Sequence, residues 1–322
     1  MEGPHSMDEN LPQNYQTPNI KRRKGFNLSG VQKRAIKNFF VAMLFLSPAL
    51  ILFITFVFVP LVRSFEISAY ITAPIGRLAK FVGFRNYERL FATPEFINSL
   101  KRTMVFVLYT VPTTIVLALG LAVLGDLRLK RIGFFRMIFS ISIAVSGATA
   151  SLMFMYIYHP TVGVNYLLSL VGIHDMTWLV SHKTALMSVS LTTVWLQLGL
   201  NTVILLAAMQ TIPEELYESA MIDGANGWNK FIHITVPMLS STFFFLLVVD
   251  MLAAFQTFTP IHIMTSGGPL QSTNLLVYSI YREFYFNGKF GFAAAQSIML
   301  FFVMLILTIL QFVFVERKVY YE

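Results

Sequence analysis

The chain has 322 residues, of which 56% are hydrophobic and 12% are charged, and its formal net charge is +8. Soluble domains carry about 25% charged residues, so this composition indicates an integral membrane protein. The chain has no cysteine, which excludes disulfides, thiolate metal sites and cysteine nucleophiles. The six histidines have no HExxH spacing and no GxxxxGK[ST] phosphate loop exists, so we expect neither a metal nor a nucleotide in this chain.

Residues 1–38 are polar, rich in Asn, Gln and Pro, and end in a basic cluster. This composition predicts a disordered start followed by a basic cytoplasmic anchor. The cluster consists of Lys21, Arg22, Arg23, Lys24, Lys33, Arg34 and Lys37.

Six apolar segments follow, each long enough for a helix to cross about 30 Å of hydrocarbon. They lie at 39–62, 103–125, 134–157, 184–209, 239–262 and 291–315. The sequence therefore predicts an all-α membrane domain over residues 39–322, with six transmembrane helices and both termini on one side.

The distribution of Lys and Arg places the termini in the cytoplasm, although the bias is weak. The basic cluster precedes the first span, and the later external loops contain few basic residues. The first external loop is an exception, since Arg77, Lys80, Arg85 and Arg89 make it basic. We expect this loop to face an acidic partner or substrate.

Residues 210–239, between spans four and five, form the one polar helix-break-helix element, which we name the 210–239 loop. Thr211 and Glu214 have capping-box spacing, and Pro213 suits a first turn, so a helix is predicted to start near residue 212. Gly224 should end it in the left-handed conformation. Asn226-Gly227 then predicts a turn, and a second segment runs from 228 to 235 until Pro237 ends or kinks it.

Two other functions fit this outline. A helix-turn-helix DNA reader has a similar arrangement, but Lys230 is the only cation in the loop and membrane spans adjoin both ends, so nucleic acid is not an expected partner. A generic interfacial loop remains an alternative.

Polar residues on spans four and five are candidates for a substrate pathway. Thr193, Gln197 and Asn201 are spaced i, i+4 and i+8, which places them on one helix face. Span five adds the polar residues Asp250, Gln256 and Thr257, and the aromatic Phe255 beside them could serve as a platform for the apolar C–H face of a sugar ring. An ionisable group in a span costs about 2.5–3.5 kcal/mol on insertion scales, so Asp250 needs a cavity or a partner. The alternative for all these polar residues is hydrogen bonding between helices.

The sequence Glu218-Ser219-Ala220, then Asp223-Gly224-Ala225, then Ile234 and Pro237 resembles the EAA loop of membrane subunits in binding-protein-dependent ABC importers. It departs from that pattern at Ser219 and Val236. The resemblance implies a cytoplasmic coupling helix that docks on an ATPase subunit. The small residues would allow close approach, and the two carboxylates would pair with Arg or Lys of the ATPase.

The resemblance extends to sugar-type permeases that form the first member of a heterodimeric pair, such as those for maltose, glycerol phosphate and multiple sugars. It rests on the sequences 45–50 (FLSPAL) with Pro60, 81–87 (FVGFRNY) and 267–269 (GGP) with Thr273. The chain departs from the family at Arg102, where an Asn is usual. In that family, parts of spans four and five line the sugar pathway.

The resemblance implies a permease subunit in the bacterial inner membrane that passes a sugar or oligosaccharide, acidic ones included. Its implied partners are a second homologous permease, two ATPase subunits that carry ATP and Mg, an extracytoplasmic solute-binding protein and membrane lipid. The alternatives are a same-family permease for a non-sugar solute such as a glycerol phosphodiester, and a secondary transporter with Asp250 as its ion site. A membrane anchor without transport is disfavoured by the polar residues in two spans.

Overall fold

The computed structural model describes residues 28–73, 76–127, 130–173, 176–314 and 316. The predicted N-terminal arm lies outside these ranges up to residue 27. The chain forms two compact units, residues 1–60 and 61–322.

The first unit contains helix α1 (Leu28–Phe53) and the π-helical turn η1 (Ile54–Phe58), and α2 (Val59–Ser68) continues into the second unit. Helix α1 begins eleven residues before the predicted start of the first span, so residues 28–38 are helical rather than an irregular arm. Its large apolar side chains, such as Phe40 and Phe45, are exposed. A helix that is apolar all round needs lipid or another protein around it.

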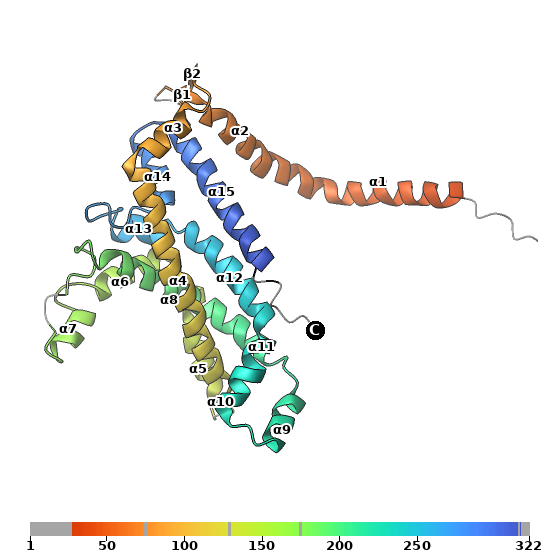
Figure 1. Ribbon diagram of the computed structural model, residues 1–322, viewed down its shortest axis with the longest axis vertical. Coiled ribbons are helices and arrows are strands. Elements are labelled where there is room, and N and C mark those ends of the chain that lie inside the picture. The colour runs from red at the N-terminus through yellow and green to blue at the C-terminus, as the bar shows by residue number, and fades with distance from the viewer. Residues whose placement is uncertain (1–27, 74–75, 128–129, 174–175, 315, 317–322) are drawn as a thin grey trace, which may run out of the picture. The chain divides into compact units, whose positions relative to one another are not determined.

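The second unit is built from helices and one small sheet, arranged as in Figure 1. Its long helices are α4 (Pro94–Asp126), α8 (Ala185–Met209), α12 (Ser240–Phe255) and α15 (Phe290–Phe314). The shorter elements are α3 (Arg85–Ala92), α5 (Ile132–Phe139), η2 (Ile141–Ala144), α6 (Gly147–Ile157), α7 (Val164–Ser169), α9 (Glu214–Ile222), α10 (Gly227–Lys230), η3 (Phe231–Thr235), α11 (Val236–Met238), α13 (Thr259–Met264), α14 (Leu276–Tyr281) and η4 (Arg282–Phe286).

Among the described residues, five helical stretches are long and apolar enough to cross a membrane. They are Lys37–Ser68, Pro94–Asp126, Ala185–Met209, Ser240–Met264 and Phe290–Phe314. Each overlaps one of the predicted spans, and the fourth span agrees with the prediction to within one residue. The second begins nine residues earlier than predicted, because Pro94 at the first helical position starts the helix upstream of the apolar run.

The predicted third span, residues 134–157, is not one helix but the succession α5, η2 and α6. Three serines explain the interruption. The hydroxyl of Ser140 donates to the carbonyl of Arg136, and Ser146 caps α6 by accepting a 3.2 Å hydrogen bond from the amide of Thr149. Ser142 accepts from the amide of Gly199 on α8. Serine side chains compete with the helical backbone for hydrogen bonds, so the helix breaks where they cluster.

The loop between the first and second spans contains a two-stranded antiparallel sheet that the all-α prediction missed. Strand β1 (Tyr70–Thr72) pairs with β2 (Leu78–Phe81), with Tyr70 opposite Phe81. The buried side chain of Asn86 donates to the carbonyls of Ser68, at 2.7 Å, and Tyr70, at 3.0 Å. These bonds hold the start of α3 against the end of α2, so the sequence 81–87 builds the hairpin end of the molecule.

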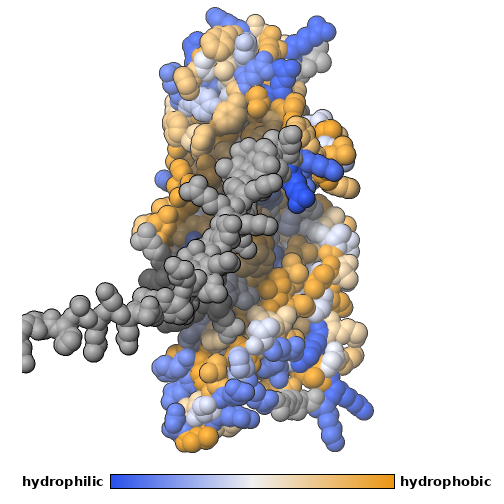
Figure 2. Space-filling view, turned by 90° about the vertical axis from the view of Figure 1, so that its right-hand side faces the viewer, coloured by the Kyte–Doolittle hydropathy of each residue, from blue (hydrophilic) through white to orange (hydrophobic). Residues whose placement is uncertain are grey.

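Helix α8 lies along α4, and α12 packs against both helices (Figure 1). The core between the helices contains Phe96, Phe106, Phe255 and Leu276, each fully buried. Figure 2 shows hydrophilic residues at the end formed by the hairpin and α3 and at the end formed by α9 and α10, with hydrophobic residues between them. This pattern is the one expected of helices that cross a hydrocarbon layer.

Gly291 permits the closest backbone approach in this packing. A Cβ at this position would lie 2.0 Å from the carbonyl oxygen of Tyr70, which belongs to β1 and is fixed by Asn86. A Cβ at Gly120, in the middle of α4, would meet nothing within 4 Å. Glycine at 291 therefore determines how tightly α15 packs on the hairpin.

We expect Gly291→Ala to lower the thermal midpoint of the purified protein and its yield from membranes, because the hairpin must move to admit the methyl group. Gly120→Ala is the matched control, and it should be neutral or stabilising by up to about 1 kcal/mol because alanine favours the helix. Thermal denaturation of both variants in the same detergent measures the difference. Equal midpoints would show that this contact is not required.

Candidate functional site

The 210–239 loop begins with α9, which starts at Glu214. Pro213 is its N-cap, with ψ near 131°, and no side chain caps the helix. The predicted capping box is therefore wrong. Thr211 is engaged elsewhere, because its hydroxyl donates to the carbonyl of Ala208 at 2.8 Å. The extended conformation of Pro213 moves the helix start two residues beyond the predicted position.

Gly224 ends α9 as predicted, with φ at +76°. The amide of Ala225 donates to the carbonyl of Ala220 at 2.8 Å, which satisfies one of the last carbonyls of the helix. Asn226 does more than turn the chain, because its side chain accepts from the amide of Asn229 at 2.8 Å and caps α10. The predicted second segment consists of α10, the π-helical turn η3 and α11, with Pro237 within α11.

One hydrogen bond joins the two arms of the loop. The hydroxyls of Tyr217 on α9 and Thr235 on η3 lie 3.0 Å apart, and Thr235 is buried. The sequence reasoning missed both residues, although a tyrosine on the apolar side of a short polar helix was an available signal. This bond ties α9 to η3, which α11 connects to the start of α12.

The outer face of this loop is exposed and combines acidic, small and large apolar residues. Glu218, Ser219, Asp223 and Gly224 are exposed, and Ala220 and Ala225 are half-buried. Ile222 is 87% exposed and Trp228 is 68% exposed. Exposed apolar residues together with carboxylates on a short helix are typical of a surface that binds another protein.

Asn201 and Asp250, predicted on separate spans, meet inside the protein. The side-chain amide of Asn201 on α8 donates to a carboxylate oxygen of Asp250 on α12 at 2.8 Å. The two residues are 2% and 3% exposed, and the ion pairs found among the described residues do not include Asp250. The carboxylate is therefore held by a neutral donor from the neighbouring helix.

The other candidates on α8 have different surroundings. Thr193 is buried and donates to the carbonyl of Val189 within its own helix. Gln197 is half-buried, and its side-chain oxygen lies 3.5 Å from the hydroxyl of Thr114 on α4. Of the three, Gln197 is the one with side-chain surface left for a solute.

The candidates on span five lie at a break in the helix. Helix α12 ends at Phe255 and α13 begins at Thr259, so Gln256 and Thr257 are outside regular helix. Phe255 is only 1% exposed and packs in the core, where a solute cannot contact it without rearrangement. Gln256 is exposed and Thr257 is half-buried. A helix broken at membrane depth is tolerated where it lines a cavity or packs against protein.

An aromatic cluster next to this break was not predicted. Phe258 and His262 stack with ring centroids 5.2 Å apart, and Tyr281 lies 4.9 Å from Phe258. The Nδ1 atom of His262 is buried without a hydrogen-bond partner among the described residues. The i, i+4 spacing of Phe258 and His262 was an available signal, but Tyr281 comes from α14 and required the fold.

Residues 265–274 form a hydrogen-bonded loop around the glycine pair. Thr273 donates to the carbonyl of Gly268 at 2.8 Å, and its hydroxyl lies 2.7 Å from that of Thr265. A Cβ on Gly267, whose φ is +81°, would lie 2.7 Å from the ring of Tyr278. The sequence 267–273 therefore has a structural role in positioning α14. Within the described residues, no group of three or more His, Cys, Asp or Glu side chains could hold a metal ion.

Comparison with known proteins identifies relatives over nearly the whole chain. Residues 89–320 match the family described as binding-protein-dependent transport system inner membrane component. The sn-glycerol-3-phosphate transport system permease protein UgpA of Agrobacterium fabrum is 35% identical over 90% of this chain and 100% of its own length. UgpA of Escherichia coli O157:H7 is 33% identical over 87% of this chain and 95% of its own.

The fold is similar to that of solved transporters. A chain of a bacterial ABC transporter involved in the import of the acidic polysaccharide alginate superimposes with a TM-score of 0.75, at 23% identity, over 89% of this chain and 98% of its own. A chain of the alginate transporter in complex with alginate pentasaccharide-bound periplasmic protein gives 0.73, at 23% identity, over 86% and 94%. On the extent of the family match and the identity to full-length relatives, the chain belongs to the inner membrane components of binding-protein-dependent transport systems.

Proposed function

We propose that this chain is one permease subunit of an ATP-driven importer, with six membrane crossings and both termini in the cytoplasm. The observation that carries the proposal is the exposed face of the 210–239 loop. Ile222 and Trp228 project from short helices, beside Glu218 and Asp223, at the end of the molecule opposite the hairpin. Such a face needs a protein partner, and a cytoplasmic ATPase subunit is that partner in the proposal.

The remaining assembly follows from the family to which the chain belongs. A second homologous permease would complete the pathway, two ATPase subunits would carry ATP and Mg, and an extracytoplasmic binding protein would deliver the solute at the hairpin end. The third crossing would be made by α5, η2 and α6 together. Closure of the ATPase dimer would move α9, and the Tyr217–Thr235 bond would pass that movement to α12.

The solute in this proposal is an acidic hydroxylated molecule, such as an acidic sugar or a polyol phosphate. Two observations support it. Relatives of about one-third identity are named for sn-glycerol-3-phosphate, and the structures with the same fold come from an importer of an acidic polysaccharide. The side chains of Arg77, Lys80 and Arg85 at the hairpin end are exposed, which would attract an anionic solute.

Within the membrane domain, we assign different roles to the candidate residues. Gln197, Gln256 and Thr257 have exposed side-chain surface and would contact the solute, while Thr193 and Phe255 form the wall behind them. The Asn201–Asp250 bond would hold α8 against α12, so that both helices move as one body.

Topology is testable because the chain has no cysteine of its own. We expect an impermeant thiol reagent applied to intact cells to label Val171→Cys and not Glu218→Cys, since the two positions flank the crossing made by α8 and both are exposed. After cell disruption and removal of the ATPase subunits, both variants should react. Strong labelling of Glu218→Cys in intact cells would reverse the proposed orientation.

Coupling is tested by ATP-driven solute uptake into vesicles that contain the reconstituted complex. Gly224→Val should reduce uptake by about tenfold or more, because a positive φ costs a β-branched residue about 1–2 kcal/mol and α9 must change its ending. Gly172→Val is the matched control, since Gly172 also has a positive φ, +83°, and open space around it.

Uptake that survives ATP depletion but stops with loss of an ion gradient would replace the importer by a secondary transporter.

The Asp250 variants separate structural from solute-binding roles. Asp250→Asn can still pair with Asn201, so we expect assembly and uptake near the wild-type level. Asp250→Leu leaves Asn201 without its partner and should lower the amount of assembled complex, since one such interhelical bond contributes about 0.6–2 kcal/mol. Complex yield and uptake are measured on the same preparations. Normal assembly with lost uptake in Asp250→Asn would mean that the charge itself contacts the solute or a coupling ion.

A further inference from the structure

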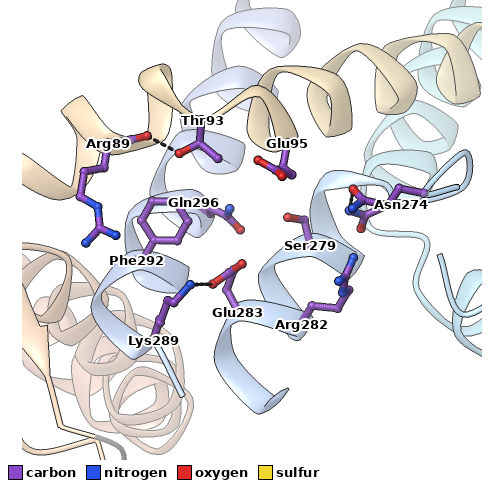
Figure 3. Close-up of a pocket in the computed structure, with 11 residues that line it drawn as sticks. Arg89, Thr93, Glu95, Asn274, Ser279, Arg282, Glu283, Lys289, Phe292 and Gln296 are labelled. Atoms are coloured by element: carbon purple, nitrogen blue, oxygen red, sulfur yellow. Dashed lines mark hydrogen bonds and ion pairs between the residues drawn. The ribbon is translucent and has the colours of Figure 1, made fainter. Parts of the chain in front are cut away.

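A cavity of about 250 Å³ lies near the hairpin end of the membrane domain, away from spans four and five. Its lining comes from α3, the start of α4, the loop before α14, α14 itself, η4 and α15, as Figure 3 shows. The volume is slightly below the range of about 300–1,000 Å³ that is typical of sites for drug-sized ligands. The cavity therefore suits a molecule about as large as a single sugar ring.

The floor of the cavity is formed by buried polar side chains with unused acceptors. Asn274 and Gln296 are each 2% exposed, and Ser279 is also buried. The Oδ1 atom of Asn274 and the Oε1 atom of Gln296 have no hydrogen-bond partner among the described residues. Buried acceptors without partners are rare in native proteins, because their desolvation is not compensated. Glu283 Oε2, which also lines the cavity, is a third buried acceptor without a hydrogen-bond partner there, but Lys289 Nζ lies 3.3 Å from it and balances its charge. The two neutral acceptors that face the cavity indicate a ligand that donates hydrogen bonds.

The rim of the cavity is charged, with three cations and two carboxylates. Lys289 lies 3.3 Å from the carboxylate of Glu283, and the guanidinium of Arg89 lies 5.9 Å from the ring centroid of Phe292. Arg282 also lines the cavity, and the ion pairs found within the described ranges do not include it. In Figure 3 the side chains of Gln296 and Glu283 point towards the centre, and Arg282 lies beside Ser279. The rim thus retains a cation for an anionic group.

We propose that this cavity binds a small hydroxylated molecule with one anionic group. Its hydroxyls would donate to Asn274 Oδ1 and Gln296 Oε1, and its carboxylate or phosphate would pair with Arg282. The inference rests on the proposed function in one respect. It takes the bound molecule to be the transported solute, or one sugar unit of it, bound at the extracytoplasmic end of the chain. The site lies within this single chain, separate from the pathway candidates on α8 and α12.

The main alternative is a lysine or arginine side chain inserted by a docking protein. The charges of the rim disfavour it, because Arg89, Arg282 and Lys289 outnumber Glu95 and Glu283, and Glu283 already has Lys289 beside it. Water alone could satisfy the floor acceptors, but it would leave Arg282 without an anion. A hydroxylated anion satisfies both the floor and the rim.

The test uses Ser279→Cys, a nearly isosteric change that places the only thiol of the chain in the cavity. The whole complex is reconstituted, with cysteine-free partners, in nanodiscs of phosphatidylcholine, so that no anionic lipid is present. The rate of alkylation by neutral iodoacetamide is then measured against increasing D-glucuronate or D-glucose, which share a ring and differ in the carboxylate. Glucuronate should protect the thiol, by about tenfold at ten times its dissociation constant, and glucose more weakly.

Second-site variants in this background identify the contacts. Arg282→Gln should bring protection by glucuronate down to the level of glucose, and Gln296→Met should reduce protection by both sugars. Gln311→Met is the matched control, because Gln311 also has a buried unpartnered Oε1 on α15 but lies about four turns further along the helix. It should leave protection unchanged.

The proposal is overturned if the thiol does not react at all, if neither sugar protects it, or if Arg282→Gln and Gln311→Met behave alike. Protection by a basic peptide of the binding protein, and not by glucuronate, would assign the cavity to protein docking instead. Because labelling needs no ATP, the outcome is independent of uptake. Protection without ATP-driven uptake would refute the proposed function alone, and normal uptake without protection would refute this site alone.

Discussion

The hydrogen bond between Asn201 and Asp250 satisfies a carboxylate that is buried between α8 and α12 in an apolar domain. Helix α8 makes polar contacts at alternate residues, Gln197 with Thr114 and Gly199 with Ser142, followed by Asn201 with Asp250. Residues two apart on a helix are separated by about 200°, so Gly199 faces away from Gln197 and Asn201. Helix α8 is thereby held on opposite sides, by η2 on one and by α4 and α12 on the other.

The same requirement explains where the helices break. In hydrocarbon, a backbone group without a partner is costly, so irregular backbone occurs only where side chains or other helices satisfy it. The serines at 140 and 146 provide such partners between α5 and α6, and Ser142 accepts from the amide of Gly199 on α8. Between α12 and α13, Gln256 and Thr257 donate their amides to carbonyls at the end of α12. Elements at both interruptions pack against α8.

The two ends of the second unit have different chemistry, which suits their different proposed partners. At the loop end, short helices with glycine and asparagine caps expose carboxylates and large apolar side chains, a combination suited to a protein surface. At the hairpin end, the side chain of Asn86 secures the hairpin on α3, and α15 packs closely on the hairpin through Gly291. Buried amides and a charged rim then enclose a cavity there, a combination suited to a small polar ligand.

The sequence by itself determined the membrane class, most of the spans and the 210–239 loop, because hydrophobicity, helix ends and the left-handed glycine at 224 are local properties of the chain. The sequence also indicated Asn201 and Asp250 as candidate residues. Only the tertiary structure decided that they form a hydrogen bond with each other, because that bond depends on the register of α8 against α12. Likewise, the hairpin, the broken third span and the cavity floor at Asn274 and Gln296 depend on contacts between residues far apart in the chain. Such contacts are determined by packing, which no local pattern of residues encodes.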